Sequence, residues 1–163
     1  MSAKKPQAAF VIADALLGAY ATNNRINVYL LENLPDEAWI AKPPGGKGRD
    51  ISSIAGHIHN VRLMWLKASG ATDIPAKLEP GTFTKQQAIA ALEASWKALE
   101  TALRTSLAGE GKIKSFKPDV VSFFGYLVAH DAHHRGQITM LARQLGHPIS
   151  QSAMFGLWEW GTR

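Results

Sequence analysis

The residues of this chain best suited to chemistry are histidines. His130 and His134 lie four residues apart in the run HDAHHRGQ, residues 130–137. On a helix, residues at this spacing share one face with Cβ atoms about 5–6 Å apart, and two imidazoles so placed can bind one metal ion. His57 occupies the apolar stripe of another predicted helix. We therefore predict a metal site formed by His57, His130 and His134.

The burial cost of these histidines favours a bound cation over chance packing. An unpaired polar side chain in a core costs about 1–3 kcal/mol, and three such side chains would cost several times more. Asp131 is predicted to project about a quarter turn away from the face shared by His130 and His134, so no carboxylate on that face would pair with them. A metal ion would satisfy all three rings at once.

A di-iron centre of the ferritin kind is disfavoured. Such centres use Glu-x-x-His motifs and further glutamates that face inward, and this chain has no Glu-x-x-His. Glu93 and Glu100 are predicted to lie on the wet face of their helix. A mononuclear site with three histidines is the better interpretation.

A site of three neutral imidazoles leaves the ion its full charge and at least one open coordination position, which is typical of catalytic metal centres. Water bound at such a position can have a pKa of about 7, and a bound thiol is deprotonated. Imidazole ligands suit zinc, nickel, iron and copper, and we expect one divalent ion, Zn, Ni or Fe. Because the chain has no cysteine, any thiol would come from a second substrate.

Three neighbours of the histidine pair are candidates for supporting roles. Arg135 is predicted to bind an anionic group of the substrate, or else to form a salt bridge on the helix surface or between subunits. Gln137 is predicted to hydrogen-bond a ligand ring or to fill a polar gap in the core. His133 lies on the flank and is expected at the rim of the site. The catalytic residues are unknown: His133 and Asp131 are the nearest candidates for a general acid or base, and neither is convincing.

The elements that must position these residues are helices. Periodic apolar residues predict four long helices, and the alternation typical of strands is not evident. In the second helix, Ile54, His57, Val61 and Met64 form the predicted stripe, with Asp50 or Ser52 as the N-cap and Gly70 as the end. The residues Thr84 to Gln87 fit a capping box at the start of the third helix. The predicted helices cover residues Gln7–Asn33, Ile51–Ser69, Thr84–Leu107 and Asp119–Leu145.

Four amphipathic helices in 163 residues predict an all-α four-helix bundle that forms a single domain over residues 1–163. The connectors are longer than is usual in simple bundles, so they are expected to form a mouth over a site or to permit a non-sequential helix order. The aromatic tail, residues 154–160, is expected to pack on the bundle or against a second subunit.

Composition narrows the class of protein. No apolar run approaches the roughly 18 residues of a membrane span, and no secretory signal is evident, so we expect a cytoplasmic protein that does not enter the membrane. The net charge of +5 permits nucleic-acid binding. However, the densest cationic cluster, Lys112, Lys114 and Lys117, falls in a predicted loop without interleaved aromatic residues, so nucleic acid is an improbable partner.

Two segments of the chain resemble the DinB-like (DinB/YfiT) family of four-helix bundles. They are SSIAGHI, residues 52–58, and HDAHHRGQI, residues 130–138. The resemblance covers nearly the whole chain. It implies a bundle in up-down-down-up order, often dimeric, with a divalent metal held by one histidine of the second helix and two of the fourth. Those positions match His57, His130 and His134.

The resemblance also implies related chemistry, since some relatives transfer low-molecular-weight thiols and others look like metal-dependent hydrolases. We therefore expect a homodimeric metal-dependent enzyme of the thiol-transferase or hydrolase type, with a small-molecule substrate that includes a low-molecular-weight thiol in the first case. The alternative is a metal-binding stress-response or interaction protein without turnover. A weaker alternative is a basic nucleic-acid-binding module.

Overall fold

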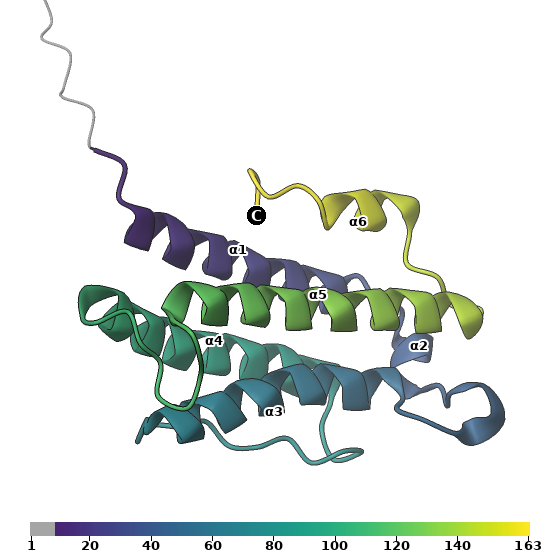
Figure 1. The fold of residues 1–163 in the computed structure, drawn as a ribbon. Coiled ribbons are helices and arrows are strands. Elements are labelled where there is room, and N and C mark those ends of the chain that lie inside the picture. The colour runs from purple at the N-terminus through teal and green to yellow at the C-terminus, as the bar shows by residue number, and fades with distance from the viewer. Residues whose placement is uncertain (1–8) are drawn as a thin grey trace, which may run out of the picture.

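The computed structural model describes residues 9–163, and over that range the regular secondary structure is entirely helical, as predicted. Figure 1 shows the long helices lying alongside one another, with shorter helices beside them. The long helices are α1 (Ile12–Glu32), α3 (Ile51–Ser69), α4 (Lys85–Ala108) and α5 (Val120–Gln144). The short ones are α2 (Asp36–Ile40), a 3-10 turn (Pro44–Gly46) and α6 (Gln151–Gly156).

The helix ends follow local capping chemistry. Asp50 caps α3 by accepting a hydrogen bond from the Ser53 amide at 2.8 Å, and Gly70 ends the helix in the left-handed conformation with φ of 90°. A capping box between Thr84 and Gln87 begins α4, as its sequence predicts. The first helix starts later than predicted, at Ile12, while residues 7 and 8 of the predicted helix lie outside the described residues.

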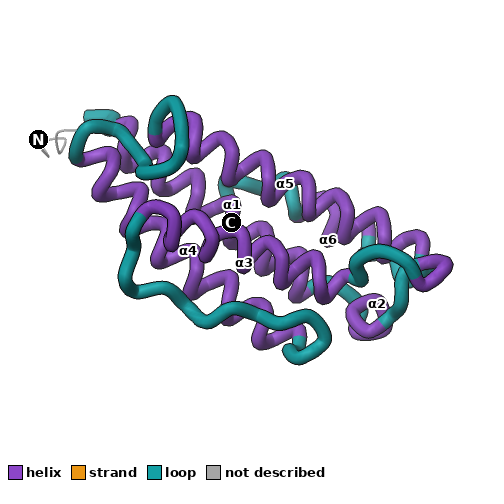
Figure 2. The backbone as a smooth tube through the Cα atoms, turned by 60° about the horizontal axis from the view of Figure 1, so that its bottom comes forward, coloured by secondary structure: helices purple, strands orange, loops and turns teal. Residues whose placement is uncertain are grey.

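The long helices pack against partners both near and far along the chain. Both α1 and α3 pack against α4 and α5, and α2 packs on α3. Figure 2 shows the connector between α3 and α4 running along the outside of the bundle. Two residues of α3 hold it there. The Nε2 atom of buried His59 bonds the carbonyl oxygen of Ala76 at 2.9 Å, and the Asn60 side chain bonds both the amide and the carbonyl of Leu78.

The hydrophobic core consists of two separate clusters, one at each end of the bundle. The cluster at the end that carries α2 and α6 includes Leu30, Ile54, Ile58, Leu92 and Ile138. The cluster at the opposite end includes Leu17, Tyr20, Leu66, Leu99 and Phe123. Each long helix therefore contributes to both clusters and carries polar residues between them.

A layer of buried polar residues separates the two clusters. The side chains of Arg62 and Asp131 are 0% and 1% exposed and form an ion pair at 2.7 Å. The same carboxylate oxygen accepts hydrogen bonds from Asn23 at 2.8 Å and Asn27 at 2.9 Å. Asp131 was predicted to lie off the apolar face of its helix, but the structure buries it at the centre, because Arg62 and the asparagines of α1 meet it there.

Two other predicted placements are wrong. Met64 is 51% exposed, because α3 turns Ile51, Ile58 and Leu66 inward and leaves the His57–Met64 edge at the groove between α3 and α5. Glu93 is partly buried, not on a wet face, since its carboxylate accepts a hydrogen bond from Asn24 of the polar layer at 3.1 Å.

The aromatic tail packs back on the bundle only in part. Met154 and Leu157 pack against the nearer core cluster, whereas Phe155 and Trp158 are 65% and 79% exposed. Among the described residues, no helix is long and apolar enough to cross a membrane.

Candidate metal centre

The three predicted ligands come together at the groove between α3 and α5. His130 and His134 lie one helical turn apart on α5, and His57 faces them from α3. Ring centroids are 5.4 Å apart for His57 and His130 and 4.7 Å apart for His57 and His134. One nitrogen from each ring lies within 4.8 Å of the other two. The three side chains therefore form a group that could hold a metal ion.

The spacing of the α5 pair fits coordination of a single ion. The Nε2 atoms of His130 and His134 are 3.2 Å apart. Two nitrogens bound to one tetrahedral zinc at about 2.0–2.1 Å would be about 3.3 Å apart.

Gln137 sets the tautomer of His134. Its side-chain oxygen lies 2.7 Å from Nδ1 of His134. An amide oxygen can only accept a hydrogen bond, so Nδ1 carries the proton and Nε2 presents a lone pair toward the other histidines. The amide nitrogen of Gln137 lies 3.0 Å from Nε2 of His133. These contacts favour the prediction that Gln137 hydrogen-bonds a ligand ring over the prediction that it fills a polar gap in the core.

Asp131 lies next to the ligand His130. Its Oδ1 atom is 3.7 Å from Nδ1 of His130 and has no hydrogen-bond partner among residues 9–163. Burial alone would raise the pKa of Asp131, but the neighbouring Arg62 guanidinium outweighs burial and lowers that pKa to about 2. A permanently charged carboxylate beside Nδ1 favours the His130 tautomer that carries its proton there, which frees Nε2 for a metal.

The surroundings lower the pKa of two of the three histidines, His57 and His134. Burial lowers the pKa of His57 to about 4, and the positive charge of Arg49 and the two other histidines add to the effect. Burial is also the largest cause of the lowered pKa of His134. Neutral imidazole is the form that binds metal ions, so a lowered pKa favours the metal-binding form of these two rings.

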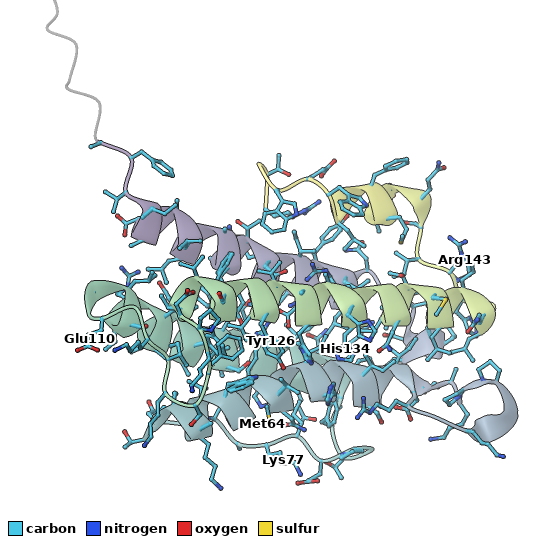
Figure 3. All side chains as sticks on the ribbon, viewed as in Figure 1. Met64, Lys77, Glu110, Tyr126, His134 and Arg143 are labelled. Carbon is cyan, nitrogen blue, oxygen red and sulfur yellow. The ribbon has the colours of Figure 1, made fainter. Side chains whose placement is uncertain are left out.

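Aromatic side chains flank the histidines on one side. Tyr126 stacks on His130 with ring centroids 5.9 Å apart, and Trp65 of α3 meets Tyr126 edge to face at 5.6 Å. Figure 3 shows Tyr126 and His134 on the side of α5 that lies toward α3, with Met64 on α3 below them. These side chains shield one flank of the histidines from water.

Arg135 has a different position from the one predicted. Its Nη1 atom donates to the side-chain oxygens of Asn23 at 2.8 Å and Asn27 at 2.6 Å, so this side chain points toward α1 and joins the polar layer. Neither a surface salt bridge nor contact with a substrate beside His57 is supported by these contacts. His133 is exposed and contacts Gln137, at the rim as expected.

Sequence reasoning missed two residues that shape this site. Arg49 lies in the connector before α3 and was not singled out from the sequence, yet it lines a pocket together with His57. Asp131 was noticed only as a weak acid–base candidate. Its burial and its bond to Arg62 make it a structural anion and not a proton donor to substrate. An acidic residue next to a ligand histidine was the available signal for Asp131.

Comparison with known sequences agrees with this architecture. The sequence model of the DinB family matches residues 6–159, nearly the whole chain. The chain therefore belongs to the DinB family. A search of curated proteins finds no match. In this DinB protein, the matched region contains all three histidines as well as Gln137, Asp131 and Arg49.

Proposed function

We propose that this DinB protein binds one divalent transition metal ion, Zn, Ni or Fe, through His57, His130 and His134, and that it is a metal-dependent enzyme acting on a small molecule. The observation that carries the proposal is the convergence of three imidazole nitrogens from two helices within 4.8 Å. The oriented tautomer of His134 supports it, because Gln137 leaves Nε2 free for coordination.

A metal held by His57, His130 and His134 would supply Lewis acidity, which suits either hydrolysis or transfer of a low-molecular-weight thiol. The protein contributes the arrangement around it. Gln137 holds the proton at Nδ1 of His134, and Asp131 favours the proton at Nδ1 of His130. Tyr126 and Trp65 exclude water from one flank. Because the described residues offer no evident general acid beside the histidines, proton transfer would involve the substrate or water.

The metal site is tested with untagged protein purified without chelator. Elemental analysis and calorimetric titration with Zn²⁺, Ni²⁺ and Fe²⁺ should give one ion per chain. His134→Ala should weaken metal binding by at least about 100-fold, which is more than the loss of a residue that only hydrogen-bonds a ligand would cause. His147→Ala, at a histidine after the end of α5, is the matched control and should bind as the wild type does. Unchanged affinity in His134→Ala would contradict the site.

Turnover separates the enzyme from its main alternative. The metal-loaded protein should convert members of a panel that pairs thiols with electrophiles, or members of a panel of esters and amides, and His134→Ala should not. Tight metal binding without turnover on either panel would instead favour the non-catalytic metal-binding protein involved in stress response or interaction.

We also propose the up-down-down-up helix order. The connector between α3 and α4, residues 70–84, could span about 50 Å when extended, whereas α3 is about 28 Å long. It is thus long enough to return along the bundle so that α3 and α4 run in the same direction. The course of this segment in Figures 1 and 2 supports that order.

A homodimer is the proposed assembly. The exposed side chains of Phe155 and Trp158 in the tail and of Met140 on α5 support it, since apolar groups of this size are commonly covered in oligomers. Sedimentation equilibrium should give twice the chain mass. Trp158→Ser should shift the equilibrium toward monomer, and a monomeric wild type at micromolar concentration would contradict the proposal.

A further inference from the structure

A pocket of about 250 Å³ adjoins His57 at the beginning of α3. Arg49 forms one side of it, and Leu78, Pro80 and Phe83 from the connector between α3 and α4 form the other. The pocket is large enough for a small organic acid or a phosphate with part of its carbon skeleton. One of its walls is the ring of a proposed metal ligand, so a molecule in it would lie beside the metal centre.

The wall opposite Arg49 is held firmly in place. The Asn60 side chain bonds the amide of Leu78 at 3.0 Å and its carbonyl at 2.8 Å. Phe83 packs directly over Gly56, where an added Cβ would come within 2.7 Å of the ring atom Cζ. Glycine at this position therefore allows the close approach of the ring. Apolar side chains anchored in this way form a defined wall and not a mobile loop.

Among residues 9–163, Arg49 is the only charged group that lines this pocket. Its guanidinium makes no ion pair or side-chain hydrogen bond with any of residues 9–163 described by the structure. Its positive charge also contributes to the lowered pKa values of both His57 and His134. Arg49 is exposed, and a guanidinium at the edge of a pocket with apolar walls is suited to bidentate recognition of a carboxylate or phosphate.

We propose that this pocket binds the anionic group of the substrate and that Arg49 is its ion partner. The substrate class is then a small carboxylate- or phosphate-bearing molecule, whose reacting part extends from the pocket past His57 toward the other two histidines. This inference rests on the proposed function in placing chemistry at the histidines, but anion binding by the pocket does not itself require a metal.

The test is calorimetric titration of the protein at pH 7.5 with succinate, with inorganic phosphate and with succinamide, the neutral analogue of succinate. Each titration is done on chelator-treated and on metal-loaded protein. The wild type should bind at least one of the two anions and not the amide. Arg49→Gln should weaken that binding at least tenfold in the metal-free form, and Arg49→Lys should restore part of it.

Lys47→Gln provides the matched control, because this exposed cation lies two residues before Arg49 in the same connector but does not line the pocket. It should bind anions as the wild type does. Equal affinity of wild type and Arg49→Gln, an equal loss in Lys47→Gln, or binding of the amide as tightly as succinate would overturn the proposal.

The two forms of the protein keep this inference separate from the proposed function. Arg49-dependent anion binding by a protein that binds no metal would support the pocket and refute the metal centre. Metal binding with no Arg49-dependent anion binding in either form would support the metal centre and refute the pocket.

Discussion

Asp131 and His130, adjacent on α5, connect the buried ion pair of the core to the metal centre: Oδ1 of Asp131 lies 3.7 Å from Nδ1 of His130. The other oxygen of the same carboxylate bonds Arg62 at 2.7 Å. One side chain therefore belongs to the polar layer between the two core clusters and also places a negative charge beside a ligand histidine. Substitutions of Asp131 should affect both folding and metal binding.

Removing the charge of Asp131 should destabilise the fold strongly. In Asp131→Asn, the fully buried Arg62 loses its anionic partner, and leaving one member of a buried pair uncompensated costs about 3–5 kcal/mol. Urea denaturation of the metal-free protein measures the free energy of unfolding. Asp73→Asn, at an exposed carboxylate in the connector after α3, should change it by less than about 0.5 kcal/mol. Similar free energies of unfolding for Asp131→Asn and Asp73→Asn would contradict a stabilising role of the pair formed by Arg62 and Asp131.

The same carboxylate predicts how stability depends on acid. Its pKa of about 2 in the folded protein lies below the ordinary value of 3.8. The resulting stabilisation, about 2 kcal/mol at 1.36 kcal/mol per pKa unit, is present above pH 4 and is lost as the pH falls from about 4 to 2. Urea denaturation from pH 5 to 2 should show this loss in the wild type, and the contribution should be missing from Asp131→Asn. If the free energies of unfolding of the wild type and Asp131→Asn fell in parallel from pH 5 to 2, the lowered pKa of Asp131 would not be the origin of the loss.

Gln137 should matter for metal affinity more than for folding. Gln137→Leu removes the acceptor that keeps the proton at Nδ1 of His134, and loss of such a supporting partner typically weakens metal binding about 10–100-fold. Zinc titration measures the effect. Gln144→Leu, at an exposed glutamine at the end of the same helix, controls for the change of residue type. A wild-type zinc affinity in Gln137→Leu would show that the hydrogen bond does not orient the ligand.

Gly56 should tolerate no side chain without movement of Phe83. A Cβ there would lie 2.7 Å from the ring, so Gly56→Ala should cost about 1–3 kcal/mol through overpacking, and Phe83→Leu should recover part of that loss. Gly125→Ala on α5, where a Cβ would meet nothing within 4 Å, should instead stabilise by about 0.5–1 kcal/mol, as expected for alanine in a helix. Thermal unfolding compares the two, and a neutral Gly56→Ala would contradict close packing of the ring.

Much of the local structure was predictable because the relevant signals lie close together in the sequence. The cap at Asp50, the capping box at Thr84 and the end of α3 at Gly70 depend on contacts within a few residues. The pairing of His130 with His134 depends on helical spacing alone. These predictions are confirmed, and so is the prediction that the described chain is all-helical.

The failed predictions concern which way a helix faces. Periodicity placed His57 in the same stripe as Met64, but several apolar stripes are possible on a helix as hydrophobic as α3. The choice among them was decided by Arg62, which turns inward to meet Asp131 of α5. This rotation leaves His57 at the groove, half-buried and accessible, instead of inside the core.

By itself, the sequence determined the helices, their caps and the histidine pair of α5, because each of these depends on interactions within one or two helical turns. Only the tertiary structure decided that His57 meets that pair, that Asp131 is buried against Arg62, and that Arg49 and the connector between α3 and α4 line one pocket beside His57. These relationships join segments far apart in the chain, and they depend on how buried charges and close-packed rings rotate each helix against its neighbours.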